Sequence, residues 1–372
     1  SPIFREALNT TVYIPHFPNT ITPELILRSF LEMYLEEQTD LLFDEEQFSL
    51  TFKIMLKSIR EDFVEYETFI PIEQFSMDDE YIELVDGWKI ERVPEDRLGE
   101  LLPEMHRFGE RSPDLKRIEF ALVRISKEKK EVVRKGKKRQ RRQTATTESI
   151  EPEIIMTALR TLKKGFCSFS DWRVRPLDWL FQRRSIGLGF RSTNIMSPFM
   201  SRGYHLTTDD IDELKELIML LNSLAKKEEL EIPISRFIYG IEREDALDKL
   251  IDYMIALESL YLQLEDELKL RFSLRIATFM AQNEKEHGEI FNLMSTAYST
   301  RSKIVHGEKW NKIEKEAKKN GYSIGGLIER VEEILRSSIN KFARFIISGQ
   351  SVKQVIEMID VSVEQDIPFF RG

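Results

Sequence analysis

The sequence predicts an α+β protein, with a mixed, β-rich N-terminal domain followed by an all-α C-terminal region. Over the first 126 residues, most apolar runs are short and alternate with polar residues, as is typical of half-buried strands. From Thr208 onward, apolar residues instead recur every three or four positions, which is typical of amphipathic helices. The chain has 372 residues, more than one domain usually contains, so we expect at least two hydrophobic cores.

The N-terminal domain is expected over residues 1–126, with one helix and a predominantly antiparallel sheet. Thr22-Pro23-Glu24 is a helix start signal, and apolar residues follow it at helical spacing to about Glu37. Asp86-Gly87 is typical of a tight hairpin turn. Strands are predicted at residues 48–56, 63–71, 81–85, 88–93 and 117–126.

A strongly basic stretch follows at residues 127–142, with ten Lys or Arg against two Glu. Residues 143–149 follow it without apolar periodicity, and we predict a flexible basic loop over residues 127–152. Such a loop is either a solvated connection or an arm that captures RNA or DNA phosphates, and a nuclear-localisation signal is a third interpretation. As an RNA-binding arm it would use Lys137, Lys138 and Arg139.

Residues 153–206 form a predicted connecting region. It begins with a helical pattern that ends near Lys164 and continues with a segment, residues 171–184, that interleaves aromatic and basic residues. Exposed aromatic rings would stack on bases while the arginines pair with phosphates. Alternatively, the aromatic residues belong to the core and the arginines line its rim. The RNA-binding candidates are Arg173, Arg175, Arg183 and Arg184.

The helical region is expected over residues 207–372. It opens with a helix capped at Thr207 that runs to about Glu229, and a connector containing Pro233 follows. The short breaks between the next helices favour an antiparallel bundle, although a Lys-rich stretch at 309–320 separates the last two. These four helices are predicted at residues 243–264, 267–281, 289–306 and 323–347. A final amphipathic piece at 352–359 and the tail at 368–370 are expected to pack on the body or on a neighbour.

The composition restricts the class of protein. A net charge of -9 disfavours uniform electrostatic coating of a polyanion, so any nucleic-acid site would be a local basic patch. Cys167 is the only cysteine, which excludes an intrachain disulfide and a cysteine-based zinc site and fits a cytoplasmic location. We find neither an apolar run of membrane-spanning length nor a signal-peptide layout, so we expect no membrane association. The histidines lack partners at metal-ligand spacing, and we expect neither a metal nor another cofactor.

The segment 298–307, Tyr-Ser-Thr-Arg-Ser-Lys-Ile-Val-His-Gly, lies at the end of a predicted helix and carries the candidate chemistry. Arg301 has a permanently charged, forked side chain suited to a phosphate. His306 is the residue type whose unperturbed pKa allows proton transfer near neutral pH. Gly307 suits the first position beyond a helix, where glycine adopts the left-handed conformation without a steric penalty. This placement puts His306 in the last turn.

Together with residues 256–261 (Ala-Leu-Glu-Ser-Leu-Tyr) and 269–277 (Lys-Leu-Arg-Phe-Ser-Leu-Arg-Ile-Ala), this segment resembles the Apea-like branch of the HEPN superfamily. The resemblance covers about residues 236–348. It implies a helical bundle and a metal-independent endoribonuclease that cleaves RNA through the 2′-hydroxyl and leaves a 2′,3′-cyclic phosphate, with Arg301 and His306 as catalytic residues. It also implies a toxin or an anti-phage abortive-defence effector, a homodimer with a composite active site, and an antitoxin or a phage-derived trigger as a further partner.

Around an ideal helix, Arg301 and His306 lie roughly 140° apart, so they do not share a face. Either Arg301 reaches around the helix, the helix is distorted, or two copies of the segment meet across a dimer. Glu258 and Arg275 would face the cleft by resemblance, or each would be an ordinary interhelical pair. A non-catalytic HEPN module that binds RNA, a nucleotide or a partner protein is the alternative function. Supporting roles are expected for Ser302, Lys303, Tyr298, Glu258 and Arg275.

Overall fold

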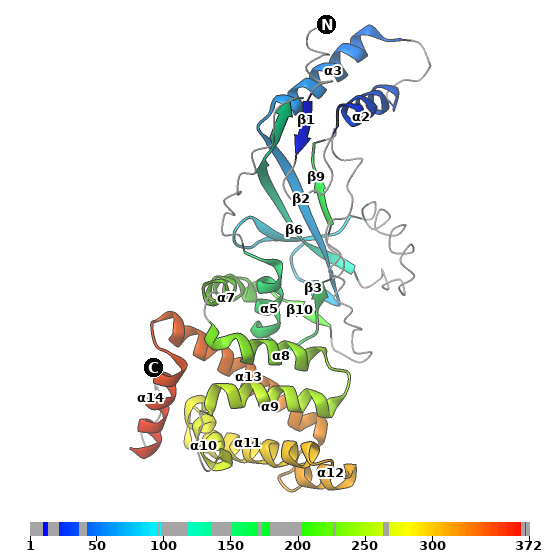
Figure 1. Ribbon diagram of the computed structural model, residues 1–372. Coiled ribbons are helices and arrows are strands. Elements are labelled where there is room, and N and C mark those ends of the chain that lie inside the picture. Colours follow the sequence, from blue (N-terminus) through cyan, green and yellow to red (C-terminus); the bar gives the residue numbers. More distant parts are fainter. Residues whose placement is uncertain are drawn as a thin grey trace. The chain divides into compact units, whose positions relative to one another are not determined.

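A computed structural model describes residues 10–13, 22–36, 43–94, 97, 118–134, 150–169, 173–178, 203–225, 228–262, 268–365 and 369 (Figure 1). The chain divides into two compact units. The N-terminal unit comprises residues 1–73, 79–149 and 169–193, and the helical unit comprises residues 74–78, 150–168 and 194–372. The predicted α+β class and the helical C-terminal part are confirmed.

The largest sheet has six strands in the order β4-β5-β6-β2-β8, with β9 also pairing with β2. The two longest strands pair antiparallel, from Phe63 opposite Lys129 to Glu73 opposite Ile118. Between β4 and β5, Asp86 and Gly87 have φ angles of 55° and 73°, as a type I′ hairpin turn requires. Four of the predicted strands and this hairpin are therefore confirmed. The strands are β2 (Phe63–Glu73), β4 (Tyr81–Glu83), β5 (Trp88–Arg92), β6 (Ile118–Lys129), β8 (Ser168–Phe169) and β9 (Arg173–Pro176).

The strand predicted at residues 48–56 is wrong, because these residues belong to helix α3 (Glu45–Arg60). The helix begins at Asp44, whose side chain accepts hydrogen bonds from two backbone N–H groups of the first turn. Apolar residues occur on several sides of this helix, so their alternation imitated a strand. It packs against the predicted helix, α2 (Pro23–Glu36). The buried residues of α3 follow helical spacing: Thr51, Met55, Ser58 and Ile59.

The loop predicted from residue 127 is wrong over its first part. Lys127 and Lys129 lie within β6 and project from its exposed face, where a strand accommodates lysine. Next, β7 (Glu131–Arg134) pairs antiparallel with β1 (Thr10–Tyr13). The apolar pattern did not reveal the strand beyond residue 126, because the outer face of a strand needs no apolar residues. The remaining candidates of the basic stretch lie outside the described residues: Lys137, Lys138 and Arg139.

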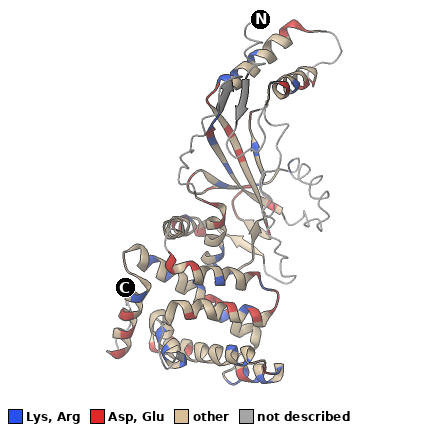
Figure 2. Ribbon diagram, viewed as in Figure 1, with Lys and Arg blue, Asp and Glu red and all other residues tan. Residues whose placement is uncertain are grey.

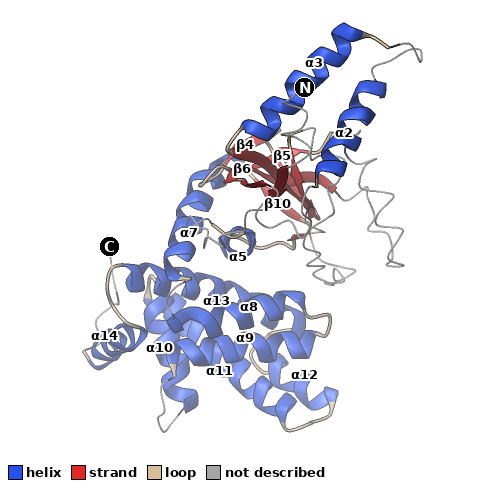
Figure 3. Cartoon of the chain, turned by 45° about the horizontal axis from the view of Figure 1, so that its top comes forward, coloured by secondary structure: helices blue, strands red, loops and turns tan. Residues whose placement is uncertain are grey.

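The helical unit contains a helical bundle (Figure 3) and a short parallel strand pair. Strand β3 (Phe75–Met77) pairs with β10 (Tyr204–Leu206). The helix predicted from residue 153 is α5 (Pro152–Leu162), and the helix predicted to follow Thr207 is α7 (Ile211–Leu224). The four helices predicted for the bundle are confirmed as α9 (Ala246–Tyr261), α10 (Leu268–Met280), α11 (Glu284–Val305) and α13 (Ile324–Ile347).

Two further helices lie where the sequence predicted none. The predicted connector is α8 (Glu231–Glu242), which tolerates Pro233 because the N–H groups of a first helical turn need no intrahelical partner. The Lys-rich stretch contains α12 (Trp310–Lys318). The amphipathic piece near the C-terminus is α14 (Val352–Glu364). From the tail, Phe369 packs against the bundle, with its ring centroid 5.0 Å from that of Phe279.

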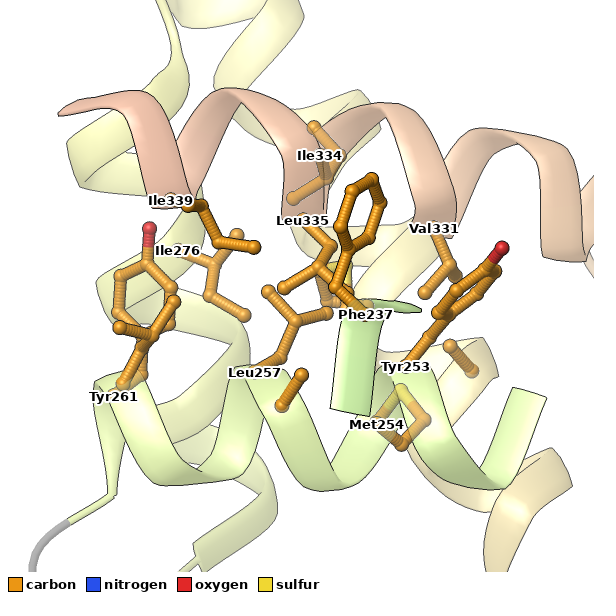
Figure 4. Packing of buried hydrophobic residues seen from close by; sticks show 14 of the residues in the cluster. Phe237, Tyr253, Met254, Leu257, Tyr261, Ile276, Val331, Ile334, Leu335 and Ile339 are labelled. Carbon is orange, nitrogen blue, oxygen red and sulfur yellow. The ribbon is translucent and has the colours of Figure 1, made fainter. Parts of the chain in front are cut away.

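Helices α8, α9, α10 and α13 contribute apolar side chains to one core in the helical unit (Figure 4). Leu257 of α9 and Leu335 of α13 are fully buried within it. The contact between α8 and α9 is close, because a Cβ atom built on Gly240 would lie 2.3 Å from Cε1 of Tyr253. This core fixes α9, and the candidate site extends from α9 to α11.

Candidate functional site

The end of helix α11 has the geometry that the sequence predicted. Gly307 has a φ of 67°, its N–H donates to the carbonyl of Ile304, and the N–H of Glu308 donates to the carbonyl of Lys303. These two hydrogen bonds define a Schellman motif with Gly307 at the first position beyond the helix. His306 is the C-cap residue and its side chain is exposed. The turn therefore presents an imidazole to solvent at a fixed point of the backbone.

Arg301, one turn earlier, is held by Glu258 of the neighbouring helix α9. Its Nη2 atom donates to Oε2 of Glu258 at 3.2 Å, and the two side chains are 27% and 21% exposed. A single, long hydrogen bond leaves most of the guanidinium's five N–H donors uncommitted to this carboxylate. The pair thus keeps capacity to bind an additional anionic or polar group.

Three buried polar side-chain atoms on these two helices have no hydrogen-bond partner in the described part of the chain. They are Nε of Arg301, Oε1 of Glu258 and Oγ1 of Thr300. Native interiors satisfy nearly all buried polar atoms, and each exception calls for an explanation; Oγ1 of Thr51 and Oδ1 of Asn340 are further examples away from these two helices. Burial raises the pKa of Glu258, while the charge of Arg301 acts in the opposite direction. Both observations make this pair the candidate site of the helical unit.

The end of the helix leaves the expected difference in direction between Arg301 and His306 in place. His306 has φ and ψ of -83° and 7°, so the chain leaves the helical path after this residue. Because its φ stays close to the helical value, its Cβ atom still follows α11, and the separation of roughly 140° from Arg301 applies. The reach of Arg301 around the helix and the meeting of two copies across a dimer stay predictions.

The proposed supporting residues of α11 contact different neighbouring elements. Lys303 lies 3.6 Å from a carboxylate oxygen of Glu316 in α12, and Tyr298 packs its ring against Phe272 with centroids 5.6 Å apart. Ser302 accepts a hydrogen bond from the backbone N–H of His306 through its carbonyl oxygen. Near the histidine, a hydrogen bond from Lys312 lowers the pKa of Glu308, and the charges of Lys303 and His306 act in the same direction. Lysine, histidine and glutamate side chains therefore interact around this turn.

Arg275 forms an interhelical ion pair, as the alternative interpretation of this residue predicted. Its Nε and Nη2 atoms each donate to a carboxylate oxygen of Asp360 in α14 at 2.7 Å. A third donor, Nη1, reaches the carbonyl oxygen of Tyr261 at 2.8 Å. The Arg275 side chain is only 2% exposed, so it is committed to holding α14 on the bundle and is not placed to meet a substrate.

The arginine candidates of the connecting region are only partly described. Arg175 lies in β9, where its Nε donates to Oε2 of Glu67 at 2.7 Å. The other oxygen of Glu67 pairs with Arg97 at 2.9 Å, so this carboxylate is shared by two guanidinium groups. Arg173 is also in β9, but its side chain, together with Arg183 and Arg184, lies outside the described residues.

Trp310 was not singled out by the sequence, although it is an isolated aromatic residue in a Lys-rich stretch. It is the first residue of α12 and 55% exposed. Basic and acidic residues both occur along this helix (Figure 2). The sequence signal that could have identified Trp310 as a candidate site residue is its position. It lies four residues after the candidate catalytic His306, with Lys309 and Lys312 nearby.

The chain matches no protein-family model, no curated protein and no solved structure. None of the helices in the described ranges combines the length and the apolarity that crossing a membrane requires. Within the same residues, no three His, Cys, Asp or Glu side chains are grouped as metal ligands.

Proposed function

We propose that this protein is a metal-independent endoribonuclease whose bundle is an Apea-like HEPN domain. The single observation that carries the proposal is the incompletely satisfied Arg301–Glu258 pair, one turn before the exposed His306. An arginine available to a phosphate and a histidine available for proton transfer are two of the groups that metal-free RNA cleavage requires.

In the proposed reaction, His306 accepts the proton of a ribose 2′-hydroxyl, and the 2′ oxygen attacks the adjacent phosphorus. Arg301 stabilises the negative charge that develops on the phosphoryl oxygens. The bond to the 5′ oxygen breaks, and this oxygen takes up a proton from the imidazolium or from water. One product ends in a 2′,3′-cyclic phosphate and the other in a 5′-hydroxyl.

The proposal extends to the assembly and to the biological role. Two copies would form a homodimer with a composite cleft, in which the paired α11 helices supply both sets of Arg301 and His306. The protein would act in the cytoplasm, for which a single cysteine is suited, as a toxin or an anti-phage abortive-defence effector. An antitoxin or a phage-derived trigger would then control it.

The test is incubation of the full chain with mixed cellular RNA in excess EDTA, followed by analysis of the product ends. Wild type is expected to release fragments with 2′,3′-cyclic phosphate ends, and His306→Ala none. His287→Ala is the matched control, because His287 lies in the same helix with its Nε2 3.2 Å from Oγ1 of Thr278; it should cleave like wild type. Cleavage by His306→Ala would refute the assignment.

A non-catalytic binding module is the second outcome of this test. The Glu258 carboxylate already neutralises part of the Arg301 charge, which suits reversible binding as well as catalysis. RNA binding without cleavage by wild type, at high protein concentration and across several RNAs, would establish the binding module and reject the nuclease.

A further inference from the structure

Trp310 is exposed at the edge of the candidate site, in contrast to the other tryptophan in the described ranges. Its side chain is 55% exposed, whereas Trp88 is 3% exposed within the sheet of the N-terminal unit. Indole is the largest side chain a protein can bury, and leaving it in water forgoes a large stabilisation. An exposed tryptophan beside charged residues is typical of a binding contact.

Trp310 is the first residue of α12 and follows His306 by four positions. Ile313 and Ala317 are buried and define the face of α12 that packs on the bundle. Trp310 lies within about 60° of both around the helix axis, yet it is 55% exposed. It therefore lies at the N-terminal edge of this packed face, on the side of the chain that leads to His306.

The connection between the two residues is short. Four residues of fully extended chain span at most roughly 14 Å, and the chain here is folded back by the hydrogen bond from the N–H of Glu308 to Lys303. The Cα atoms of Trp310 and His306 therefore lie closer than that limit, so one RNA strand can contact both side chains.

The uncommitted charge beside Trp310 is positive. Lys309 directly precedes it and is exposed, and no ion pair of Lys309 occurs among the described residues. Lys312 and Glu314 lie two and four residues after Trp310 and are each paired, with Glu308 at 2.6 Å and with Lys318 at 2.9 Å. The centres of protein interfaces are depleted in lysine, whereas phosphate-binding surfaces combine lysine with exposed aromatic rings.

We propose that Trp310 stacks on an unpaired base of the RNA next to the scissile phosphate, while Lys309 contacts the adjoining phosphate. This inference rests on the proposed function and adds a substrate-positioning residue to it. Stacking would hold the reacting phosphate against the His306 turn. Loss of one base–aromatic stack weakens binding roughly 5- to 150-fold.

The experiment measures binding and not cleavage. The full chain carrying His306→Ala is titrated against a fluorescently labelled single-stranded RNA that contains the wild-type cleavage site, and anisotropy gives the affinity. Adding Trp310→Ala should weaken binding roughly 5- to 150-fold. Trp310→Phe should weaken binding less than Trp310→Ala, because the phenylalanine ring still stacks. Val305→Ala is the control, since Val305 is also 55% exposed and offers no ring; its affinity should stay unchanged.

A second series identifies the base. RNAs that lack a single base are compared at each position around the cleavage site. At one position, removal of the base should weaken binding to the Trp310 protein and leave binding to Trp310→Ala unchanged, because the partner of that base is already absent. Equal losses with both proteins at every position would overturn the stacking assignment.

The remaining outcomes separate this inference from the proposed function. Normal cleavage by wild type together with unchanged affinity of Trp310→Ala would reject the role of Trp310 and leave the nuclease intact. Conversion of a dimer to a monomer by Trp310→Ala, observed by sedimentation, would assign Trp310 to a subunit contact and also reject stacking. Absence of both cleavage and binding in every variant would reject the two proposals together.

Discussion

Two arginines on neighbouring helices of the bundle pair with carboxylates in very different ways. Arg275 of α10 is almost fully buried, forms two hydrogen bonds of 2.7 Å to Asp360 and a third to a carbonyl oxygen. Arg301 of α11 is partly exposed, forms one hydrogen bond of 3.2 Å to Glu258, and leaves its Nε atom without a partner in the described part of the chain.

The difference separates an ion pair with saturated hydrogen bonds from one without. A buried pair is tolerated only when its hydrogen bonds compensate the loss of hydration, and the Arg275 region meets that condition. The Arg301 pair remains partly exposed and makes a single, longer hydrogen bond. The saturation of hydrogen bonds, more than the presence of the charges, distinguishes the two regions, and it is why Arg301 is the candidate for binding another molecule.

The largest effect is expected at Asp360→Asn, which leaves the buried Arg275 without its carboxylate. Its free energy of unfolding should fall by about 3 to 5 kcal/mol, because an uncompensated charge remains in the interior. Urea unfolding followed by circular dichroism measures the loss. Glu216→Gln is the matched control, since its partner Arg344 is 51% exposed, and should cost below about 1 kcal/mol. Equal losses of unfolding free energy in Asp360→Asn and Glu216→Gln would contradict the special role of the buried ion pair.

Next in size is the effect of Arg301→Gln on RNA cleavage. We expect the rate to fall about 10²- to 10³-fold, because a group that stabilises developing charge is lost. The cost in stability should be about 1 to 3 kcal/mol, below that of Asp360→Asn. Arg330→Gln, on an arginine that is 54% exposed and paired with Glu333, should leave the cleavage rate unchanged. A similar loss of cleavage rate in both variants would contradict the assignment of Arg301 to the active site.

A smaller effect is expected at the turn after α11. Gly307→Ala forces a side chain into a φ of 67° and should lower the free energy of unfolding by about 1 to 2 kcal/mol. Gly325→Ala is the control, because a Cβ there would meet nothing within 4 Å and its φ is not positive; it should raise stability by about 0.4 to 1 kcal/mol. Stabilisation by both changes would show that the turn is not constrained.

The smallest effect is expected in the pH dependence of stability that Glu258 contributes. Because burial raises the pKa of this carboxyl group in the folded protein, the folded state binds the proton more tightly than the unfolded state. Wild-type stability relative to Glu258→Gln is therefore greatest below the unfolded pKa of about 4.3 and declines as pH rises through the folded pKa. Urea unfolding of both proteins between pH 4 and pH 7 measures this difference. A difference that grows with pH would have the wrong sign.

Local signals in the sequence were sufficient for much of the fold and for the backbone of the site. Asp86-Gly87 predicted the hairpin because few other residue pairs adopt positive φ twice in succession. Gly307 predicted the end of α11 for a similar reason. Helical spacing of apolar residues predicted α9, α10, α11 and α13, since each buries one face in a common core.

Other features depend on tertiary contacts that periodicity does not encode. The residues of α3 alternate in a strand-like way, yet only the face with Met55 and Ile59 is buried against α2. Helix α12 has few apolar residues, and its position becomes clear only when Ile313 and Ala317 meet the bundle. The Arg301–Glu258 pair joins residues 43 positions apart, and no local pattern specifies which carboxylate Arg301 will meet.

The pairing of Arg275 with Asp360 also has a consequence for the timing of synthesis. The two residues are 85 positions apart, which a ribosome covers in roughly 4 to 17 s at ordinary rates of elongation. During that interval Arg275 lacks its carboxylate and α10 cannot reach its final buried state. Because α10 lies against α11, the helix that carries Arg301 gains its finished neighbour only after α14 has been made. A nascent chain therefore completes its candidate site only after α14 has been synthesised.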